Sequence, residues 1–218
     1  MADPLAALRE EVSRLHRELP RNGLVSWTSG NLSARVPGAE LMVIKPSGVA
    51  YEDLTPASMV VCDFDGTVVE GELAPSSDAA THGYVYRHLA VGGVAHTHSP
   101  YATAWAIAGT SVPCVMTAMA DEFGGSIPVG PFTLIGDDTI GRGIVQTLDG
   151  HPSPAVLMRS HGVFTVGAGP RDAVKAAVMC EDAARTVLLA RSLGVIQPLD
   201  PDDIDALHDR YQHVYGQR

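Results

Sequence analysis

The stretch GGVAHTHSPYATAWA (residues 92–106) decides the fold of this chain. Its first half, GVAHTH, is typical of a short strand, and Pro100 begins a helical stretch directly after it. Side chains two residues apart on a strand lie on the same face, so His96 and His98 are expected to point the same way near the strand end. Two imidazoles placed in this way can reach one metal ion.

A third ligand would complete a catalytic metal site that keeps one position open. His161 is the best candidate, because it lies in a Ser-His-Gly turn between two short apolar runs. The chain has nine histidines, so a His-x-His spacing also arises by chance, and the spacing alone leaves both a metal site and an unrelated pair open. Three nitrogen ligands suit zinc, with manganese or cobalt as alternatives. The other histidines are expected on helix surfaces or in loops: His16, His82, His88, His151, His208 and His213.

Outside this stretch, helix and strand patterns mix without a regular alternation. Apolar residues at spacings of three and four predict a helix over residues 5–19, and a long helix is expected over 170–193. The other expected elements are strands at 41–45, 59–64, 155–159 and 163–167, a helix at 74–90, short strands between 110 and 150, and a short helix with a terminal arm at 202–218.

Two local signals refine this pattern. Asp65-Gly66 predicts a hairpin turn after the strand at 59–64, and Ser76 or Ser77 is the expected cap of the helix at 74–90. We therefore expect an α/β fold with a single domain over residues 1–218. Its central, mostly antiparallel sheet should be flanked by helices on its faces.

The composition is that of an acidic globular protein, with 45% hydrophobic residues, 18% charged residues and a formal net charge of −10. An acidic surface disfavours binding to nucleic acid or to an anionic membrane. No apolar run reaches the roughly 18 residues of a membrane-spanning helix. The N-terminal residues lack the pattern of a secretory signal, and three widely spaced cysteines do not suggest a disulfide framework. We expect a cytoplasmic protein.

Three small, polar segments are suited to holding an anion. Glycine lets backbone N–H groups approach an oxyanion, and Ser, Asn and Lys side chains add donors. The serine pair also stands at the expected start of a helix, where the helix dipole favours negative charge. Taken singly, each segment is more often an ordinary turn or helix cap, and none matches a known nucleotide-binding motif. The candidate residues are Gly30, Asn31, Lys45, Ser47, Gly48, Ser76 and Ser77.

Three residues are candidates for acid–base chemistry. Asp78 follows the serine pair in the expected first helical turn, where a carboxylate commonly complements the dipole; its functional role would be that of a metal ligand or a proton carrier beside the metal. Asp121 lies in an Ala-Asp-Glu-Phe-Gly-Gly segment that is expected to turn, and Tyr215 lies near the C-terminus. Composition alone gives no function to the last two.

Taken together, these segments resemble the class II aldolase/adducin family. The matching stretches occur in the order of the family and extend over most of the chain, and the combination of HTHS, PSSD, KPSG and SHG is highly specific. They are LVSWTSGNLSA (24–34), VIKPSGVAYEDLTPASMVV (43–61), VVEGELAPSSDAATH (68–82), GGVAHTHSPYATAWA (92–106) and RSHGVFTVG (159–167), with YGQ (215–217) near the end.

The resemblance implies a zinc site at His96, His98 and His161, with Asp78 as a further ligand or a base. It also implies that the anion-binding candidates named above contact a phosphorylated sugar, and that Asp121 and Tyr215 form an acid–base pair. Members of this family are typically fourfold-symmetric homotetramers with active sites between subunits. A C-terminal tyrosine can therefore complete the site of a neighbour.

The implied activity is the breaking and making of a carbon–carbon bond next to a carbonyl, by retro-aldol and aldol steps. PSSD, KPSG and YGQ resemble the epimerases of the family, and an aldolase, which releases the aldehyde without re-adding it, is the alternative. The segment from residue 121 to 155 and the tail are shorter than in those epimerases, which leaves the sugar open.

Two further alternatives lie outside catalysis. An adducin-like binding module would keep the fold without the reaction, but it would have no need of the intact histidine set. A metal-free α/β scaffold would require every motif match to be accidental.

Overall fold

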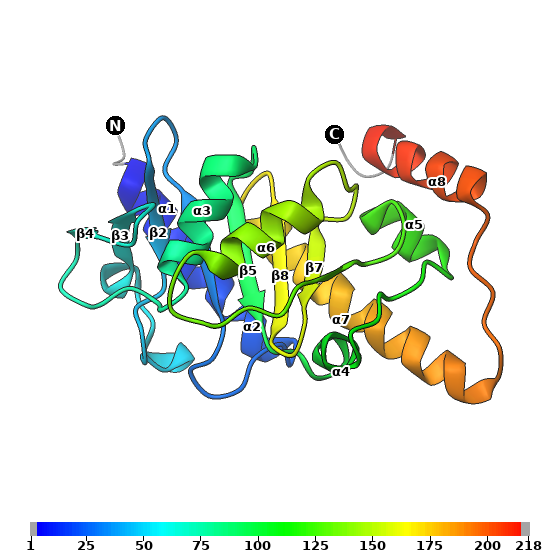
Figure 1. Cartoon of the computed structure of the whole chain (residues 1–218). Helices are drawn as coiled ribbons and strands as arrows, with labels where there is room; N and C mark the ends of the chain where they lie inside the picture. Colours follow the sequence, from blue (N-terminus) through cyan, green and yellow to red (C-terminus); the bar gives the residue numbers. More distant parts are fainter. Residues whose placement is uncertain (1–3, 215–218) are drawn as a thin grey trace.

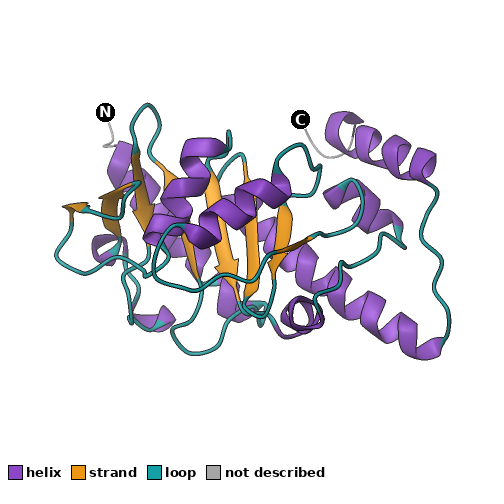
Figure 2. Ribbon diagram, in the orientation of Figure 1, coloured by secondary structure: helices purple, strands orange, loops and turns teal. Residues whose placement is uncertain are grey.

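The computed structural model describes residues 4–214, in which helices pack on both sides of a central sheet (Figures 1 and 2). The α-helices are α1 (Pro4–His16), α2 (Glu18–Arg21), α3 (Ala79–His88), α4 (Pro100–Ala108), α5 (Thr117–Phe123), α6 (Thr139–Leu148), α7 (Pro170–Leu193) and α8 (Pro201–Val214). The strands are β1 (Asn31–Arg35), β2 (Leu41–Ile44), β3 (Val60–Asp63), β4 (Val68–Glu70), β5 (Gly93–Thr97), β6 (Val129–Gly130), β7 (Ala155–Met158) and β8 (Gly162–Gly167). Two short 3-10 helices, η1 (Tyr51–Asp53) and η2 (Pro56–Ser58), lie between β2 and β3.

The central sheet has eight strands in the order β4-β3-β2-β1-β5-β8-β7-β6. Neighbouring strands are antiparallel except β6 and β7, which run parallel. The expected α/β class with a mostly antiparallel sheet is confirmed. The register places Asn31 of β1 opposite His96 of β5, and His96 opposite Phe164 of β8. One predicted metal ligand therefore lies in the middle of the sheet.

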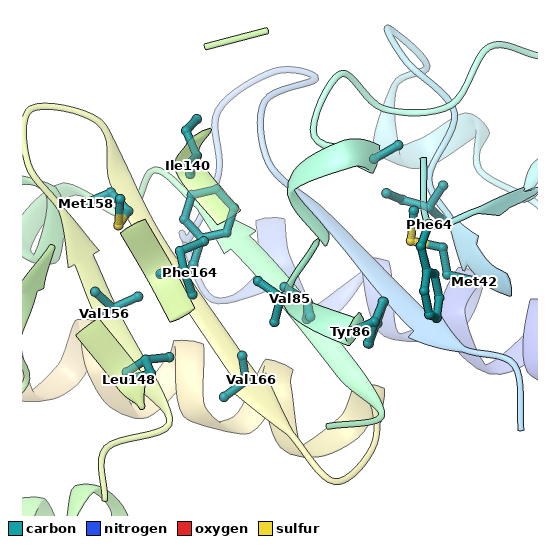
Figure 3. Packing of buried hydrophobic residues seen from close by; sticks show 14 of the residues in the cluster. Met42, Phe64, Val85, Tyr86, Ile140, Leu148, Val156, Met158, Phe164 and Val166 are labelled. Atoms are coloured by element: carbon teal, nitrogen blue, oxygen red, sulfur yellow. The ribbon is translucent and has the colours of Figure 1, made fainter. Parts of the chain in front are cut away.

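Helices cover both faces of the sheet (Figure 1). On one face lie α3 and α6, and Val85 and Ile140 from these helices pack with Phe164 of β8 in one apolar cluster (Figure 3). On the other face lie α1 and α7, which contribute Val12 and Val174 to a second cluster. Burial of apolar side chains in both layers is the main favourable contribution to folding.

The C-terminal helices extend this arrangement beyond the sheet. A third apolar cluster joins α4, α5 and α7 to β7 and β8. The last helix, α8, lies against α5 and buries none of its residues fully (Figure 1). Between residues 4 and 214, no helix has both the length and the apolarity that crossing a membrane requires.

The region from residue 110 to 150 differs from the expected short strands. It contains α5 and α6, and its one named strand, β6, has only two residues. In α6, Ile140, Ile144 and Leu148 recur at four-residue spacing, and all three are buried. Glycine disfavours a helix interior and obscured this pattern. A Cβ on Gly141 would lie 2.8 Å from Cβ of Tyr84, so glycine here allows close packing of α6 on α3.

The helix expected at residues 74–90 also begins differently. Helix α3 starts at Ala79, and its N-cap position is Asp78, not Ser76 or Ser77. Ser76 Oγ instead accepts a hydrogen bond from the Asp78 N–H at 3.3 Å. The serine pair therefore precedes the helix, at the edge of the cavity described next.

Candidate metal and sugar-phosphate site

One cavity of about 410 Å³ lies at the end of β5, between α3 and the loops that follow α2 and β2. Every metal-ligand and anion-binding candidate from the sequence lines it, together with one acid–base candidate. These residues are Gly30, Asn31, Lys45, Ser47, Gly48, Ser76, Ser77, Asp78, His96, His98 and His161. Segments that are distant in the sequence are therefore brought to a single site.

The three histidines converge at one point of this cavity. Each of His96, His98 and His161 offers one nitrogen, and these nitrogens lie within 4.8 Å of one another. Nε2 of His98 lies 2.8 Å from Nε2 of His96, and the His96 and His161 ring centres are 4.8 Å apart. Three imidazoles facing a common point are the arrangement that a divalent ion of the zinc type requires.

The pairing of β5 with β8 explains how the chain achieves this convergence. His96 lies on β5, and His161 occupies the turn that leads into the neighbouring strand β8. Gly162 follows this turn, and a Cβ on it would lie 2.6 Å from the Thr97 carbonyl oxygen and 3.1 Å from the His98 ring. Glycine is therefore needed here for the backbones and rings to come together.

The protonation of the histidines also fits metal binding. His96 Nδ1 lies 2.9 Å from the Val163 carbonyl oxygen, to which it donates, and this leaves the Nε2 lone pair facing the other rings. Burial lowers the pKa of His96 to about 3 and also lowers the pKa of His98 and of His161. Neutral imidazoles are the form that binds metal.

Asp78 is the carboxylate closest to this cluster. Its Oδ2 lies 4.0 Å from His96 Nε2 and accepts a hydrogen bond from Asn31 Nδ2 at 2.6 Å. Burial raises the pKa of the Asp78 carboxyl, but the interactions with His96 and His82 and the hydrogen bond from Asn31 leave it below its ordinary value. Asp78 is therefore a charged group at the edge of the metal cluster.

Lys45 makes the cavity suited to an anion. The Lys45 side chain is buried, and its Nζ lies 3.3 Å from the Thr28 and Pro46 carbonyl oxygens. Among residues 4–214, no carboxylate lies within ion-pair distance of this ammonium group. Burial lowers the pKa of Lys45, because a buried cation without a negatively charged partner is unfavourable. A phosphate in the cavity would supply the missing negative charge.

The anion-binding candidates that line the cavity form an anion cradle: Gly30, Asn31, Lys45, Ser47, Gly48, Ser76 and Ser77. Two of its glycines have backbone conformations that other residues rarely adopt. Gly30 and Gly48 have φ values of 74° and 69°, in the left-handed region that L side chains rarely adopt. A Cβ on Gly30 would also lie 2.7 Å from the His96 carbonyl oxygen. Asn31 was predicted to contact substrate, but its amide nitrogen is engaged by Asp78 and, at 3.0 Å, by Ser76 Oγ.

The remaining acid–base candidates do not line this cavity. Asp121 lies in helix α5, not in a turn, and its Oδ1 is 3.8 Å from Arg210 of α8. Tyr215 lies outside the described residues 4–214. Within one chain, the described residues therefore bring the metal and anion candidates together but not Asp121.

Several cavity residues were not predicted from the sequence. They are Thr28, Thr81, Ile135, Gly136 and Ile140, whereas Ser29, which also lines the cavity, belongs to the polar segment Ser29-Gly30-Asn31 that the sequence indicated. Ile135 and Gly136 lie in the loop before α6, in the region where the expected strands were wrong. The prediction that His16 and His82 lie on the surface was also wrong, because both are fully buried.

Most of the chain matches a known protein family. The family model described as "Class II Aldolase and Adducin N-terminal domain" matches residues 10–188. The chain belongs to the class II aldolase and adducin family. The resemblance inferred from the sequence motifs is confirmed.

Among relatives in this family, the L-ribulose-5-phosphate 4-epimerase UlaF of Salmonella paratyphi B is 41% identical to this chain. The alignment is 223 positions long and covers 96% of this chain and 95% of that protein. A solved L-fuculose 1-phosphate aldolase has a TM-score of 0.89 at 25% identity, covering 97% of this chain and 98% of that one. The L-fuculose-1-phosphate aldolase of Thermus thermophilus has a TM-score of 0.73 at 25% identity, with coverages of 86% and 96%. Both named activities therefore occur among similar proteins.

Proposed function

We propose that the chain is an L-ribulose-5-phosphate 4-epimerase that uses a zinc ion held by His96, His98 and His161, with manganese or cobalt as alternative ions. The observation that carries the proposal is the meeting of a three-histidine cluster and an anion cradle in one cavity. The 41% identity to an epimerase over 96% of the chain favours this activity over others in the family.

The cradle would hold the phosphate of the sugar. Lys45 supplies a buried positive charge, Ser47, Ser76 and Ser77 supply hydroxyl donors, and Gly48 lets backbone N–H groups approach. Because the histidines line the same cavity, the carbonyl end of the sugar would then lie at the metal. Asn31 would act mainly by holding Asp78 in place.

The chemistry follows from the substrate. Carbon 4 of the ketopentose phosphate carries no acidic proton, so its inversion requires that the C3–C4 bond break and form again on the other face. When bound, a zinc ion would supply positive charge that stabilises the negative charge developing on substrate oxygens. Asp78 would lie beside it as a further ligand or a base, and its low pKa keeps it ionised for either role.

A second copy of the chain would supply the acid–base pair. Asp121 does not line the cavity of its own chain, and Tyr215 follows directly after α8 in the sequence, outside the described residues. We therefore propose a cytoplasmic homotetramer in which Asp121 and Tyr215 complete a site on a neighbouring subunit. Each would transfer a proton on one face of the aldehyde intermediate.

An L-fuculose-1-phosphate aldolase is the second candidate, favoured by the TM-score of 0.89 with such an enzyme. It would share the metal cluster and the cradle and differ only in releasing the aldehyde. A non-catalytic adducin-like module is disfavoured, because the three histidines and the buried Lys45 are all present in one cavity.

Incubation of zinc-loaded protein with each of the two substrates distinguishes these candidates. We expect D-xylulose 5-phosphate to form from L-ribulose 5-phosphate. Formation of dihydroxyacetone phosphate and lactaldehyde from L-fuculose 1-phosphate, without epimerisation, would assign the aldolase instead. A Tyr215→Phe variant should retain zinc and lose most of the epimerisation, and unchanged turnover in this variant would refute the role of the tail.

A further inference from the structure

Helix α3 and strand β1 make a regular set of polar contacts behind the cavity. Four residues of an α-helix span about 6 Å along its axis, and two residues of a strand span about 6.6–6.8 Å. Residues four apart on α3 can therefore face residues two apart on β1. The contacts pair Asn31 with Asp78 (2.6 Å), Ser33 with His82 (2.7 Å) and Arg35 with the Tyr86 carbonyl oxygen (3.0 Å).

His82 occupies the middle of this set and has no exposed surface. Its ring meets the edge of Phe164 at 6.1 Å between centres, and Phe164 stacks on the metal-ligand candidate His96 at 4.1 Å. Burial lowers the pKa of His82 to about 4, although the nearby Asp78 charge opposes this shift. The ring is therefore neutral near pH 7 and carries a single N–H proton.

The hydrogen-bond contacts of His82 favour one of the two ring nitrogens as the one that holds this proton. Ser33 Oγ lies 2.7 Å from His82 Nδ1 and also 2.7 Å from the Tyr86 hydroxyl. Burial raises the pKa of Tyr86, so it keeps its proton and needs an acceptor. If Tyr86 donates to Ser33, the Ser33 hydroxyl proton has His82 Nδ1 as its acceptor, and the ring proton then lies on Nε2.

The Nε2–H group then lies on the side of the ring away from Nδ1 and Ser33. Helical side chains lean toward the N-terminus, and the residue one turn before His82 is Asp78. Within residues 4–214, His82 Nε2 has no hydrogen-bond partner, and the buried Asn31 Oδ1 also lacks one. Among the described residues, the Asn31–Asp78 pair therefore has a buried acceptor without a partner, and His82, which interacts electrostatically with Asp78, has a buried ring nitrogen without one.

We infer that His82 is a positioning residue, whose Nε2–H group faces the Asn31–Asp78 pair and holds the Asp78 carboxylate oriented toward the metal cluster. The Ser33–Tyr86 chain sets the tautomer that makes this possible. The inference rests on the proposed role of Asp78 at the metal site. The buried, hydrogen-bonded side chains of Tyr86, Ser33 and His82 would thus serve to support that site.

The tautomer is tested first, on the metal-free protein and without any substrate. Long-range proton–nitrogen NMR of protein labelled with 15N-histidine should show His82 neutral and protonated at Nε2 at pH 7. Ser33→Ala removes the donor to Nδ1 and should shift the His82 population toward the Nδ1–H form. The buried-serine control Ser13→Ala should leave the spectrum of His82 unchanged. An Nδ1–H tautomer in the wild type would overturn the inference.

Zinc affinity, measured by competition with a chelator, tests the effect on the site. Loss of a partner that orients a ligand typically weakens metal binding about 10–100-fold, and we expect this loss for His82→Phe. His82→Gln keeps an amide donor and should lose less, and His88→Phe, on the exposed part of the same helix, should lose nothing. Equal affinity in a folded His82→Phe protein would refute the inference. If the wild type itself binds no zinc, the proposed function fails, and the NMR experiment still decides the tautomer.

Discussion

At the scale of single residues, Lys45 gives a direct test of the anion cradle. We expect Lys45→Met to raise the KM for the sugar phosphate about 10–100-fold, because a hydrogen bond to a charged group contributes about 1.5–3 kcal/mol. The fold should be retained, because removal of the Lys45 ammonium group leaves no carboxylate of the described residues without an ion-pair partner. Steady-state kinetics with Arg21→Met as control, an exposed cation outside this cavity, measures the effect. An unchanged KM would exclude Lys45 from substrate binding.

The histidines show what sequence spacing can and cannot predict. The same-face rule for strands correctly placed His96 and His98 together, and the motif SHG placed His161 beside them. The rule says nothing about burial of a lone histidine. His16 is buried because its Nε2 accepts from the Leu32 N–H at 3.0 Å, a contact between segments that no local pattern reveals. His82 was missed for the same reason.

At the scale of elements, helix α3 depends on close approach to the turn after β3. A Cβ on Gly83 would lie 1.9 Å from the Phe64 carbonyl oxygen. We therefore expect Gly83→Ala to destabilise the protein by about 1–3 kcal/mol through overpacking, although alanine favours a helix by about 1 kcal/mol. Urea unfolding measures this change, with Gly169→Ala as the comparison, because Gly169 has an extended backbone (φ −150°) and no atom within 4 Å of an added Cβ. A more stable Gly83→Ala protein would contradict the packing described here.

Elements with a clear periodic pattern were predicted well, and those interrupted by glycine were not. The long helix α7 was expected at residues 170–193 and occupies those residues, with Pro170 at its start. Helix α6 was missed because Gly141 and Gly143 interrupt its apolar repeat. Their function is tertiary: a Cβ on Gly143 would lie 2.9 Å from Pro131, so the glycines reflect packing that the local sequence does not specify.

At the scale of the whole molecule, buried histidines should make stability depend on pH. Burial lowers the pKa of His16 to about 3, of His82 to about 4 and of His96 to about 3, against 6.5 in the unfolded chain. Below pH 6.5 the unfolded chain binds protons that the folded chain does not, so acid favours unfolding. The free energy of unfolding of the metal-free protein should therefore fall as pH falls from 6.5 toward 4, by up to about 1.4 kcal/mol per pH unit for each histidine.

Urea unfolding at several pH values and one protein concentration measures this slope. A His16→Gln variant cannot titrate at that position, so its stability should depend less steeply on pH over the same range. A flat profile in the wild type would mean that these histidines are not buried in the folded protein.

The proposed sharing of sites between subunits makes a second prediction at this scale. His98→Asn and Asp121→Asn should each be inactive alone, for loss of the metal and of the acid–base pair respectively. If each site uses His98 from one chain and Asp121 from another, unfolding and refolding an equal mixture should restore about one quarter of wild-type activity. If both residues act within one chain, mixing should restore none.

The central claim is that three imidazoles, from β5, from the residue that follows it and from the turn before β8, hold one divalent ion. Crystals grown with zinc and measured on both sides of the zinc absorption edge test it most directly. We expect one anomalous peak per chain, at about 2.0–2.1 Å from a nitrogen of each of His96, His98 and His161. A peak bound elsewhere, or rings that turn away from a common point in the zinc-soaked crystal, would contradict the claim.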